Sequence, residues 1–348
     1  MDVSAEPINM EYISEASEIL RKGGLVAFPT ETVYGLGGDA KDKEASRKIY
    51  AAKGRPSDNP LIVHISKFSQ LEAISKDLPE NAKKLADAFW PGPLTMVVNK
   101  NEVVPYETTG GLDTVAVRMP NNPVALALIN ESGCMIAAPS ANTSGRPSPT
   151  KASHVAQDLS GKIDAILDGG AVDIGLESTI VDLTEDIVTV LRPGYINMDM
   201  LSKVVGQVRM DPGIVFNDKG TTTGAKPKAP GMRYKHYAPK GDLTIVSGEE
   251  KTVISKINEM TKEAIAKGSK VGIIATSETA DKYLDGQILV IGDRVDERSI
   301  AHNLYDILRQ FDELEVDVIY SESFATPNMG QAIMNRLLKA AGQKTIEV

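Results

Sequence analysis

The feature that most constrains this chain is a stretch rich in proline, glycine and lysine, about two thirds of the way along its 348 residues. Between Lys219 and Lys240 the sequence has six Lys or Arg residues, three Gly and three Pro, and no Asp or Glu. Proline and glycine at this density interrupt helices and strands. The sequence therefore predicts two folded domains, 1–210 and 242–348, joined by a basic linker over 211–241. Such a linker is either a solvated tether or a lid over a binding site.

The overall composition argues against several classes of protein. The net charge is -9 and aromatic residues make up 5% of the chain, so we expect direct contact with tRNA to be weak and local. The single cysteine, Cys134, cannot form an intramolecular disulfide or a cysteine-based zinc site. The first residues lack the basic and apolar regions of a secretory leader, and no apolar run is long enough to span a bilayer. We therefore expect a cytoplasmic protein without a membrane segment.

The last third of the chain alternates short apolar runs with segments of helical periodicity. This alternation is typical of a parallel sheet with crossover helices. We expect a smaller, Rossmann-like parallel α/β domain, and no glycine fingerprint follows its first strand. The predicted strands are 243–246, 271–275, 288–291 and 316–320, and the predicted helices are 250–267, 298–312 and 330–341.

The first 200 residues also read as mixed α/β, with shorter and more closely spaced strands. Asn122 and Pro123 are typical of a helix start, with an N-cap followed by proline at the first helical position. That helix is expected to run to about Ile129. The other predicted helices are 42–52 and 81–89, and the predicted strands are 25–28, 61–65, 114–119, 135–138, 164–167, 179–183 and 187–191.

A glycine-rich segment after the first strand needs a separate interpretation. Residues 35–40 read Gly-Leu-Gly-Gly-Asp-Ala and match the dinucleotide fingerprint G-x-G-x-x-A. Pro29 and the polar residues after it end the strand well before the first glycine, whereas the fingerprint needs its turn at the strand end. We therefore interpret these glycines as a tight turn, with an NAD-dependent enzyme as a distant alternative.

Cationic and small polar residues gather where predicted strands and helices meet loops. Lys53 and Gly54 are typical of an ordinary helix C-terminus. Arg55, held between Gly and Pro, is also typical of an arginine positioned to form two parallel hydrogen bonds to a phosphate or a carboxylate. Strand alternation places Thr114 and Arg118 on one face, where the arginine either faces solvent or captures a carboxylate.

Other polar residues lie where ligands commonly bind in α/β proteins. A polar loop containing Ser140, Asn142 and Ser148 follows an apolar strand; it is either a plain turn or a ligand loop. His64 lies within a strand, where a satisfied core histidine is the usual outcome. No metal-ligand spacing, Ser-His-Asp arrangement or Walker A sequence is present.

Several segments, taken together and in order, resemble the YrdC-like family of threonylcarbamoyl-AMP synthases. The basic linker and the extra α/β domain resemble the longer, two-domain form of that family. The match covers nearly the whole chain. Its segments are residues 28–36 (FPTETVYGL), 53–56 (KGRP), 59–64 (NPLIVH), 90–95 (WPGPLT), 115–118 (VAVR), 138–142 (APSAN), 177–179 (EST), 191–194 (LRPG) and 229–239 (APGMRYKHYAP).

The resemblance implies an N-terminal twisted α/β domain with a concave cavity. It also implies an enzyme that converts L-threonine, bicarbonate and ATP, with Mg²⁺, into threonylcarbamoyl-adenylate and pyrophosphate. Partner proteins, the tRNA threonylcarbamoyl-transferase machinery, would then modify the adenosine next to the anticodon. The implied catalytic residues, from the K-x-R and S-x-N motifs of the family, are Lys53, Arg55, Ser140 and Asn142; the implied threonine-binding residues are Thr32, His64, Arg118, Ala138 and Ser178; and the implied ATP-binding residues are Arg55, Asn59, Thr114, Ser140, Ser148, Arg192 and Tyr234.

Two other functions stay open at this point. One is an RNA- or tRNA-binding module without chemistry of its own, which a continuous basic face would support and the net charge of -9 opposes. The other is a carbamoyl-transfer domain of the hydrogenase-maturation type, which shares the core fold. The absence of acylphosphatase-like and zinc-finger segments argues against it. The sequence names no magnesium ligands and no general base other than His64.

Overall fold

The computed structural model describes residues 1–214, 236–324 and 327–348. Its internal contacts divide the chain into two compact units. We call them the N-terminal unit and the C-terminal unit and describe each by itself. The N-terminal unit comprises Met1–Ser144, Pro149–Asp173 and Glu177–Tyr234, and the C-terminal unit comprises Gly145–Ser148, Ile174–Leu176 and Lys235–Val348. Most of the expected linker lies outside the described residues, and so does Tyr234.

The N-terminal unit is built on a mixed sheet of ten strands in the order β10-β9-β8-β4-β5-β3-β6-β2-β1-β7. Its strands are β1 (Val26–Phe28), β2 (Gly35–Asp39), β3 (Ile62–His64), β4 (Leu94–Asn99), β5 (Thr114–Arg118), β6 (Ile136–Ala138), β7 (Ala165–Ile166), β8 (Thr179–Asp182), β9 (Val188–Arg192) and β10 (Val208–Met210). Its helices are α1 (Met10–Arg21), α2 (Lys43–Lys53), α3 (Phe68–Ile74), α4 (Glu80–Phe89), α5 (Pro123–Ser132), α6 (Ala152–Leu159) and α7 (Met198–Val205).

Local sequence signals set the ends of the helices next to the site. At the start of α5 the side chain of Asn122 accepts hydrogen bonds from the amides of Val124 and Ala125, with Pro123 in the first turn, as predicted. Helix α2 begins after an Asp42 cap and ends at Gly54, which has a φ of 61°. The glycine turns the chain directly after Lys53.

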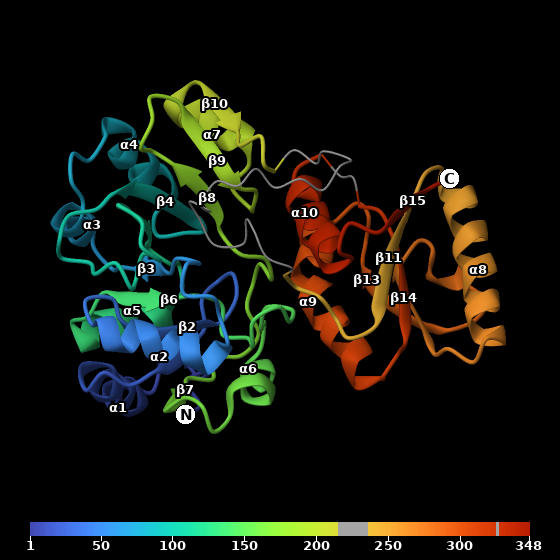
Figure 1. The fold of residues 1–348 in the computed structure, drawn as a ribbon, viewed down its shortest axis with the longest axis horizontal. Helices are drawn as coiled ribbons and strands as arrows, with labels where there is room; N and C mark the ends of the chain where they lie inside the picture. Colours follow the sequence, from blue (N-terminus) through green and yellow to red (C-terminus); the bar gives the residue numbers. More distant parts are fainter. Residues whose placement is uncertain (215–235, 325–326) are drawn as a thin grey trace. The chain divides into compact units, whose positions relative to one another are not determined.

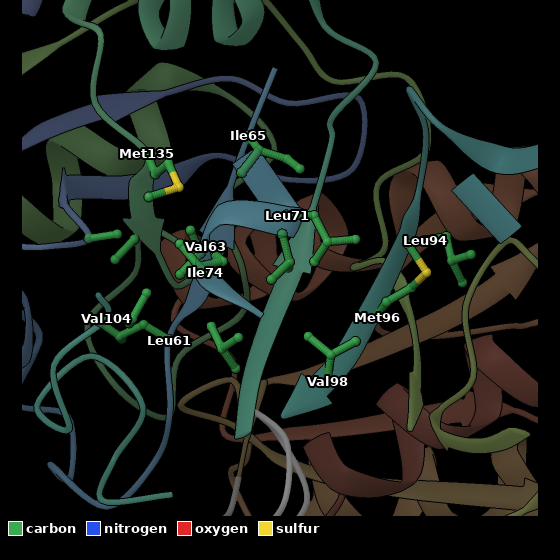
Figure 2. Close-up of a cluster of buried hydrophobic side chains, with 14 of the residues drawn as sticks. Leu61, Val63, Ile65, Leu71, Ile74, Leu94, Met96, Val98, Val104 and Met135 are labelled. Carbon is green, nitrogen blue, oxygen red and sulfur yellow. The ribbon is translucent and has the colours of Figure 1, made fainter. Parts of the chain in front are cut away.

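Alternating residues of the central strands face opposite sides of the sheet. One side carries the main apolar core, in which Val63, Met96 and Val98 from β3 and β4 pack with Leu71 and Ile74 from α3, as Figure 2 shows. The opposite side carries a small separate cluster. Its members are Ile62, Val97, Ala116, Ile180 and Leu191. Strand alternation places His64, Thr95 and Arg118 on that second side as well.

The glycine-rich segment is a strand and not the tight turn expected from the sequence. Residues Gly35–Asp39 form β2, which pairs antiparallel with β1 and with β6. A Cβ atom on Gly37 would lie 2.6 Å from Cγ2 of Ile136 and 2.8 Å from Cε1 of Phe28. These glycines therefore allow neighbouring side chains to pack closely over the sheet, which is a common role of glycine within a strand.

The C-terminal unit has a five-stranded, all-parallel sheet in the order β13-β12-β14-β11-β15, which confirms the expected fold class. Helix α8 lies on one face of this sheet, and α9 and α10 lie on the other (Figure 1). Its strands are β11 (Asp242–Ser247), β12 (Val271–Thr276), β13 (Gln287–Gly292), β14 (Val318–Glu322) and β15 (Thr345–Glu347). Its helices are α8 (Glu250–Ala266), the 3-10 turn η1 (Ala280–Lys282), α9 (Glu297–Glu313) and α10 (Gly330–Ala340).

A short segment from the middle of the chain belongs to the C-terminal unit. The carbonyl of Pro147 accepts a hydrogen bond of 2.6 Å from the buried Arg309. Nη2 of Arg146 lies 3.1 Å from Oδ2 of Asp312, and the amide of Ala238 donates to the carbonyl of Gly145. These contacts attach residues 145–148 to helix α9 and to the chain before β11. Within the described parts of the chain, no helix is both long and apolar enough to cross a membrane.

Candidate active site

Lys53, the last residue of α2, connects two of the sequence motifs. Its side chain is buried, and its ammonium donates one hydrogen bond of 2.5 Å to the carbonyl of Ser140 and another to the carbonyl of Asn142. The carbonyl of Lys53 in turn accepts from the amide of Ser144. The structure therefore brings the K-x-R and S-x-N motifs, far apart in the sequence, into direct contact.

The loop after β6 is fixed by further hydrogen bonds. The hydroxyl of Ser140 donates to Oδ1 of Asn142 at 2.5 Å, and Nδ2 of Asn142 donates to the carbonyl of Thr143 at 2.9 Å. The amide of Ala141 donates to the carbonyl of Tyr34, in the segment between β1 and β2. These hydrogen bonds fix the shape of the loop beside the ammonium of Lys53.

Arg55 is held on a stiff turn, as the sequence indicated. Its Nε and Nη2 atoms donate to the carbonyls of Asn59 and Pro60, at 3.1 and 3.0 Å. The side chain of Asn59 is buried, and its Oδ1 atom has no hydrogen-bond partner among the described residues. A buried polar atom without a partner is costly to folding and is often explained by a ligand. Folding alone therefore does not account for the buried amide oxygen of Asn59.

Arg118 lies at the end of β5 at the centre of a second group of polar residues. Its Nη1 atom donates to the hydroxyl of Thr32 at 2.8 Å, and its Nε atom donates to the carbonyl of Gly92 at 3.3 Å. Its Nη2 atom lies 2.7 Å from Oε1 of Glu31, and both side chains are almost fully buried. Arg118 therefore faces protein groups and not solvent. The sequence had not singled out Glu31 or Gly92.

A third group of polar residues lies on β4, on β9 and directly before β8. The hydroxyls of Ser178 and Thr95 are 2.7 Å apart, and Arg192 donates to both the carbonyl and the hydroxyl of Ser178, at 3.0 and 3.2 Å. Thr95 is the partner of Arg118 in the register of β4 with β5. Thr95 therefore connects Ser178 and Arg192 with the neighbourhood of Arg118. The sequence signal for Thr95 was its place in the segment at 90–95.

His64 is the neighbour of Arg118 in the parallel register of β3 with β5. Burial, and then the positive charge of Arg118, lower the pKa of His64 to about 3. Its Nδ1 atom lies 3.1 Å from the carbonyl of Ile62. The imidazole is therefore neutral at physiological pH and a very weak base.

The remaining predicted site residues lie in different places. Ala138 ends β6 and is the register partner of Ile62, and Thr114 begins β5 opposite Asn99. Ser148 is buried and groups with the C-terminal unit. Among the residues described, no group of three or more His, Cys, Asp or Glu side chains could hold a metal ion.

Two family models together match most of the chain. One, described as telomere recombination and named for Sua5, YciO and YrdC proteins, matches residues 18–194. The other, described as the C-terminal domain of threonylcarbamoyl-AMP synthase, matches residues 196–342. The two matches follow one another along the sequence, which is the order expected for the two-domain form.

Individual relatives match over the full length. The threonylcarbamoyl-AMP synthase of Pyrococcus abyssi is 50% identical over 99% of this chain and 98% of its own, and that of Bacillus subtilis is 48% identical with the same coverage. A crystal structure of P. abyssi Sua5 complexed with L-threonine matches 100% of this chain and 99% of its own, with 47% identity and a TM-score of 0.92. The chain belongs to the threonylcarbamoyl-AMP synthase family of nucleotidyltransferases, in its two-domain Sua5 form.

Proposed function

We propose that this chain joins L-threonine, bicarbonate and ATP into threonylcarbamoyl-AMP and pyrophosphate, in the cytoplasm. The product would supply the tRNA threonylcarbamoyl-transferase machinery that modifies the adenosine next to the anticodon. The observation that carries the proposal is the contact of Lys53 with the S-x-N loop, which follows β6 in the same sheet that carries the buried Arg118 group on β5. The threonine-bound P. abyssi structure, which matches the whole chain, supports the choice of amino acid.

Threonine would bind at the Arg118 group. A guanidinium held by Thr32 and Gly92 is a rigid fork for the substrate carboxylate. Ser178 and Thr95 offer hydroxyls beside it, and Ala138 offers main-chain groups at the end of β6. The neutral ring of His64 would line the pocket without adding charge. Threonine would be preferred over serine through its methyl group, worth about 1–3 kcal/mol in an apolar pocket.

ATP would bind beside the cationic residues at the end of α2 and at the end of β9. Lys53, Arg55 and Arg192 place fixed positive charge where the phosphates would lie, and Ser140 and Asn142 offer polar groups beside Lys53. Asn59, Thr114, Ser148 and Tyr234 are the other proposed nucleotide contacts. Mg²⁺ would arrive with ATP as part of the substrate, because this ion is usually held by phosphates, waters and few protein ligands.

The chemistry would proceed in two steps. The threonine nitrogen forms a bond to the carbon of bicarbonate, with loss of water and a proton, and so becomes an N-carboxylate. An oxygen of this carboxylate then attacks the α-phosphate of ATP, and the bond from that phosphorus to the leaving pyrophosphate breaks. Nucleotidyl transfer requires mainly positioning and neutralisation of charge, which rigid Lys and Arg side chains supply. With a pKa of about 3, His64 does not serve as the base at neutral pH.

An isotope experiment tests this proposal. The chain is incubated with Mg-ATP, L-threonine and ¹³C-bicarbonate, and the adenylate is identified by mass spectrometry. We expect a threonylcarbamoyl-adenylate that carries the ¹³C label and that is absent when threonine is omitted. An adenylate without the label, or none at all, would reject the proposed reaction.

A further inference from the structure

The ion pair between Glu31 and Arg118 is poorly satisfied for one so deeply buried. Glu31 is 5% exposed and Arg118 is 3% exposed. Although Nη2 of Arg118 lies 2.7 Å from Oε1 of Glu31, the angles do not make a hydrogen bond. Both carboxylate oxygens of Glu31 and the Nη2 atom therefore have no aligned hydrogen-bond partner among the described residues.

Such a pair is not explained by folding. Taking two charges out of water is costly, and the cost is recovered only when further hydrogen bonds satisfy the remaining lone pairs and protons. The side chain of Arg118 has two such bonds, to Thr32 and Gly92, whereas the carboxylate of Glu31 has none to any described residue. The carboxylate is therefore the less satisfied member of the pair, because neither of its oxygens has a partner while two nitrogens of Arg118 do. A carboxylate in this state is suited to receiving a cation from a ligand.

A free α-amino acid is the complement of this pair. It carries a carboxylate and an ammonium group on one carbon, so it can offer an anion to Arg118 and a cation to Glu31 at the same time. Once a substrate carboxylate takes the guanidinium, Glu31 would be left as a buried anion without compensation, which is strongly unfavourable. An ammonium group from the same ligand restores the balance of charge and supplies three N–H donors.

We propose that Glu31 binds the ammonium group of the substrate, so that Glu31 and Arg118 together recognise the zwitterion of a free α-amino acid. The inference rests on the proposal that Arg118 holds the threonine carboxylate. It makes Glu31 a specificity-determining residue, because an acid with a hydroxyl in place of the amine can donate one hydrogen bond but brings no positive charge to the buried carboxylate.

The test compares two ligands on two proteins by isothermal titration calorimetry. The ligands are L-threonine and (2S,3R)-2,3-dihydroxybutanoate, in which a hydroxyl replaces the amine. For the wild type we expect threonine to bind at least about 30-fold more tightly than the hydroxy acid. For Glu31→Gln we expect threonine to bind about 10- to 100-fold more weakly, while the hydroxy acid, which no longer leaves a buried anion uncompensated, binds at least as tightly as to the wild type.

Controls separate this role from a structural one. Glu107→Gln removes a carboxylate that pairs with Arg47 on the exposed surface, and it should leave both affinities unchanged. Glu31→Asp keeps the charge and should retain part of the preference for threonine even if the glutamine variant does not fold. ATP binding to each variant reports that the domain is intact.

The outcomes are distinct. Equal weakening of both ligands by Glu31→Gln, or no weakening of threonine, would overturn the role of Glu31 while leaving the proposed reaction standing. If magnesium dependence of ATP binding shifts while threonine binding does not, Glu31 is a metal ligand and the inference is wrong. A wild type that binds ATP but not threonine would instead reject the proposed function.

Discussion

The ammonium of Lys53 lies 2.5 Å from the carbonyl oxygen of Ser140, and this contact ties the end of α2 to the loop after β6. The same ammonium also donates to the carbonyl of Asn142. Lys53 therefore has two proposed functions. It fixes the shape of the S-x-N loop, and it brings a buried positive charge to the place where the ATP phosphates are proposed to bind.

Replacing Lys53 with methionine should remove both functions. We expect adenylate formation to fall at least about 100-fold, because fixed charge at the phosphates contributes several kcal/mol to nucleotidyl transfer. We also expect a loss of stability of about 1–3 kcal/mol, because two carbonyls lose their donor. Pyrophosphate release measures the first effect. Denaturant unfolding followed by the fluorescence of Trp90, the single tryptophan, measures the second in the N-terminal unit.

Lys48→Met is the matched control for that variant. Lys48 lies on the same helix, is exposed, and donates to the carbonyl of Gly23. It should keep wild-type turnover. If Lys53→Met also keeps it, Lys53 does not take part in the reaction.

Replacing Arg118 with lysine should affect threonine more than ATP. Lysine keeps the charge but cannot contact Thr32, Gly92 and a substrate carboxylate in one plane. Loss of one charge-assisted hydrogen bond, about 1.5–3 kcal/mol, predicts a fall of about 10- to 100-fold in kcat/KM for threonine. The KM for ATP should stay close to its wild-type value. Steady-state kinetics with each substrate varied in turn measures both, and a change confined to ATP would contradict the assignment.

The stability of the N-terminal unit should depend on pH through His64. Burial lowers the pKa of His64 to about 3 in the folded protein, below the ordinary value of 6.5. Below pH 6.5 the imidazole of the unfolded chain takes up a proton, while that of the folded chain stays neutral. The free energy of unfolding is therefore unaffected by His64 above pH 6.5, and it decreases as the pH falls from 6.5 toward 3. The slope is at most about 1.4 kcal/mol per pH unit.

The comparison variant for this effect is His64→Gln. Urea unfolding of both proteins at several pH values, followed through Trp90, should show a steeper loss of stability below pH 6.5 in the wild type. If the free energy of unfolding of the two proteins changed with pH in the same way, the fold would not be holding His64 neutral. The pH dependence of the rate of adenylate formation near pH 6.5 should be the same in the wild type and in His64→Gln.

The glycines of β2 give a prediction about packing alone. In Gly37→Ala the new methyl group would lie 2.6 Å from Ile136 and 2.8 Å from Phe28, so the variant should lose about 1–3 kcal/mol of stability. In Gly35→Ala the nearest atom, Cβ of Ala138, is 3.3 Å away. Gly35→Ala should therefore lose clearly less stability than Gly37→Ala, as measured by urea unfolding. Equal losses of stability would show that close packing of Ile136 and Phe28 against β2 does not depend on glycine at position 37.

Regular periodicity made most of the fold predictable. The parallel sheet of the C-terminal unit followed from apolar strands alternating with amphipathic helices, and the start of α5 followed from its Asn-Pro signal. Strand β2 was wrongly read as a turn, because four of its five residues are Gly or Asp, which local propensity disfavours in strands. Tertiary packing against β1 and β6 overrides that propensity.

The site was predictable where residues lie in recognisable motifs and not where their role depends on a distant neighbour. Lys53, Arg55 and Arg118 were singled out from local pattern and resemblance. Glu31 and Thr95 were not, because each matters through its relation to Arg118, 87 and 23 positions away in the sequence. A buried ion pair between segments far apart in the chain is visible only once the strands are assembled.

Pyrophosphate release from ATP is the most direct test of the central claim that this chain makes threonylcarbamoyl-AMP. It is measured with Mg-ATP in four mixtures, with and without L-threonine and with and without bicarbonate. We expect release only when both are present. Release that persists without threonine or without bicarbonate would show that another group accepts the adenylate and that the chain does not make threonylcarbamoyl-AMP.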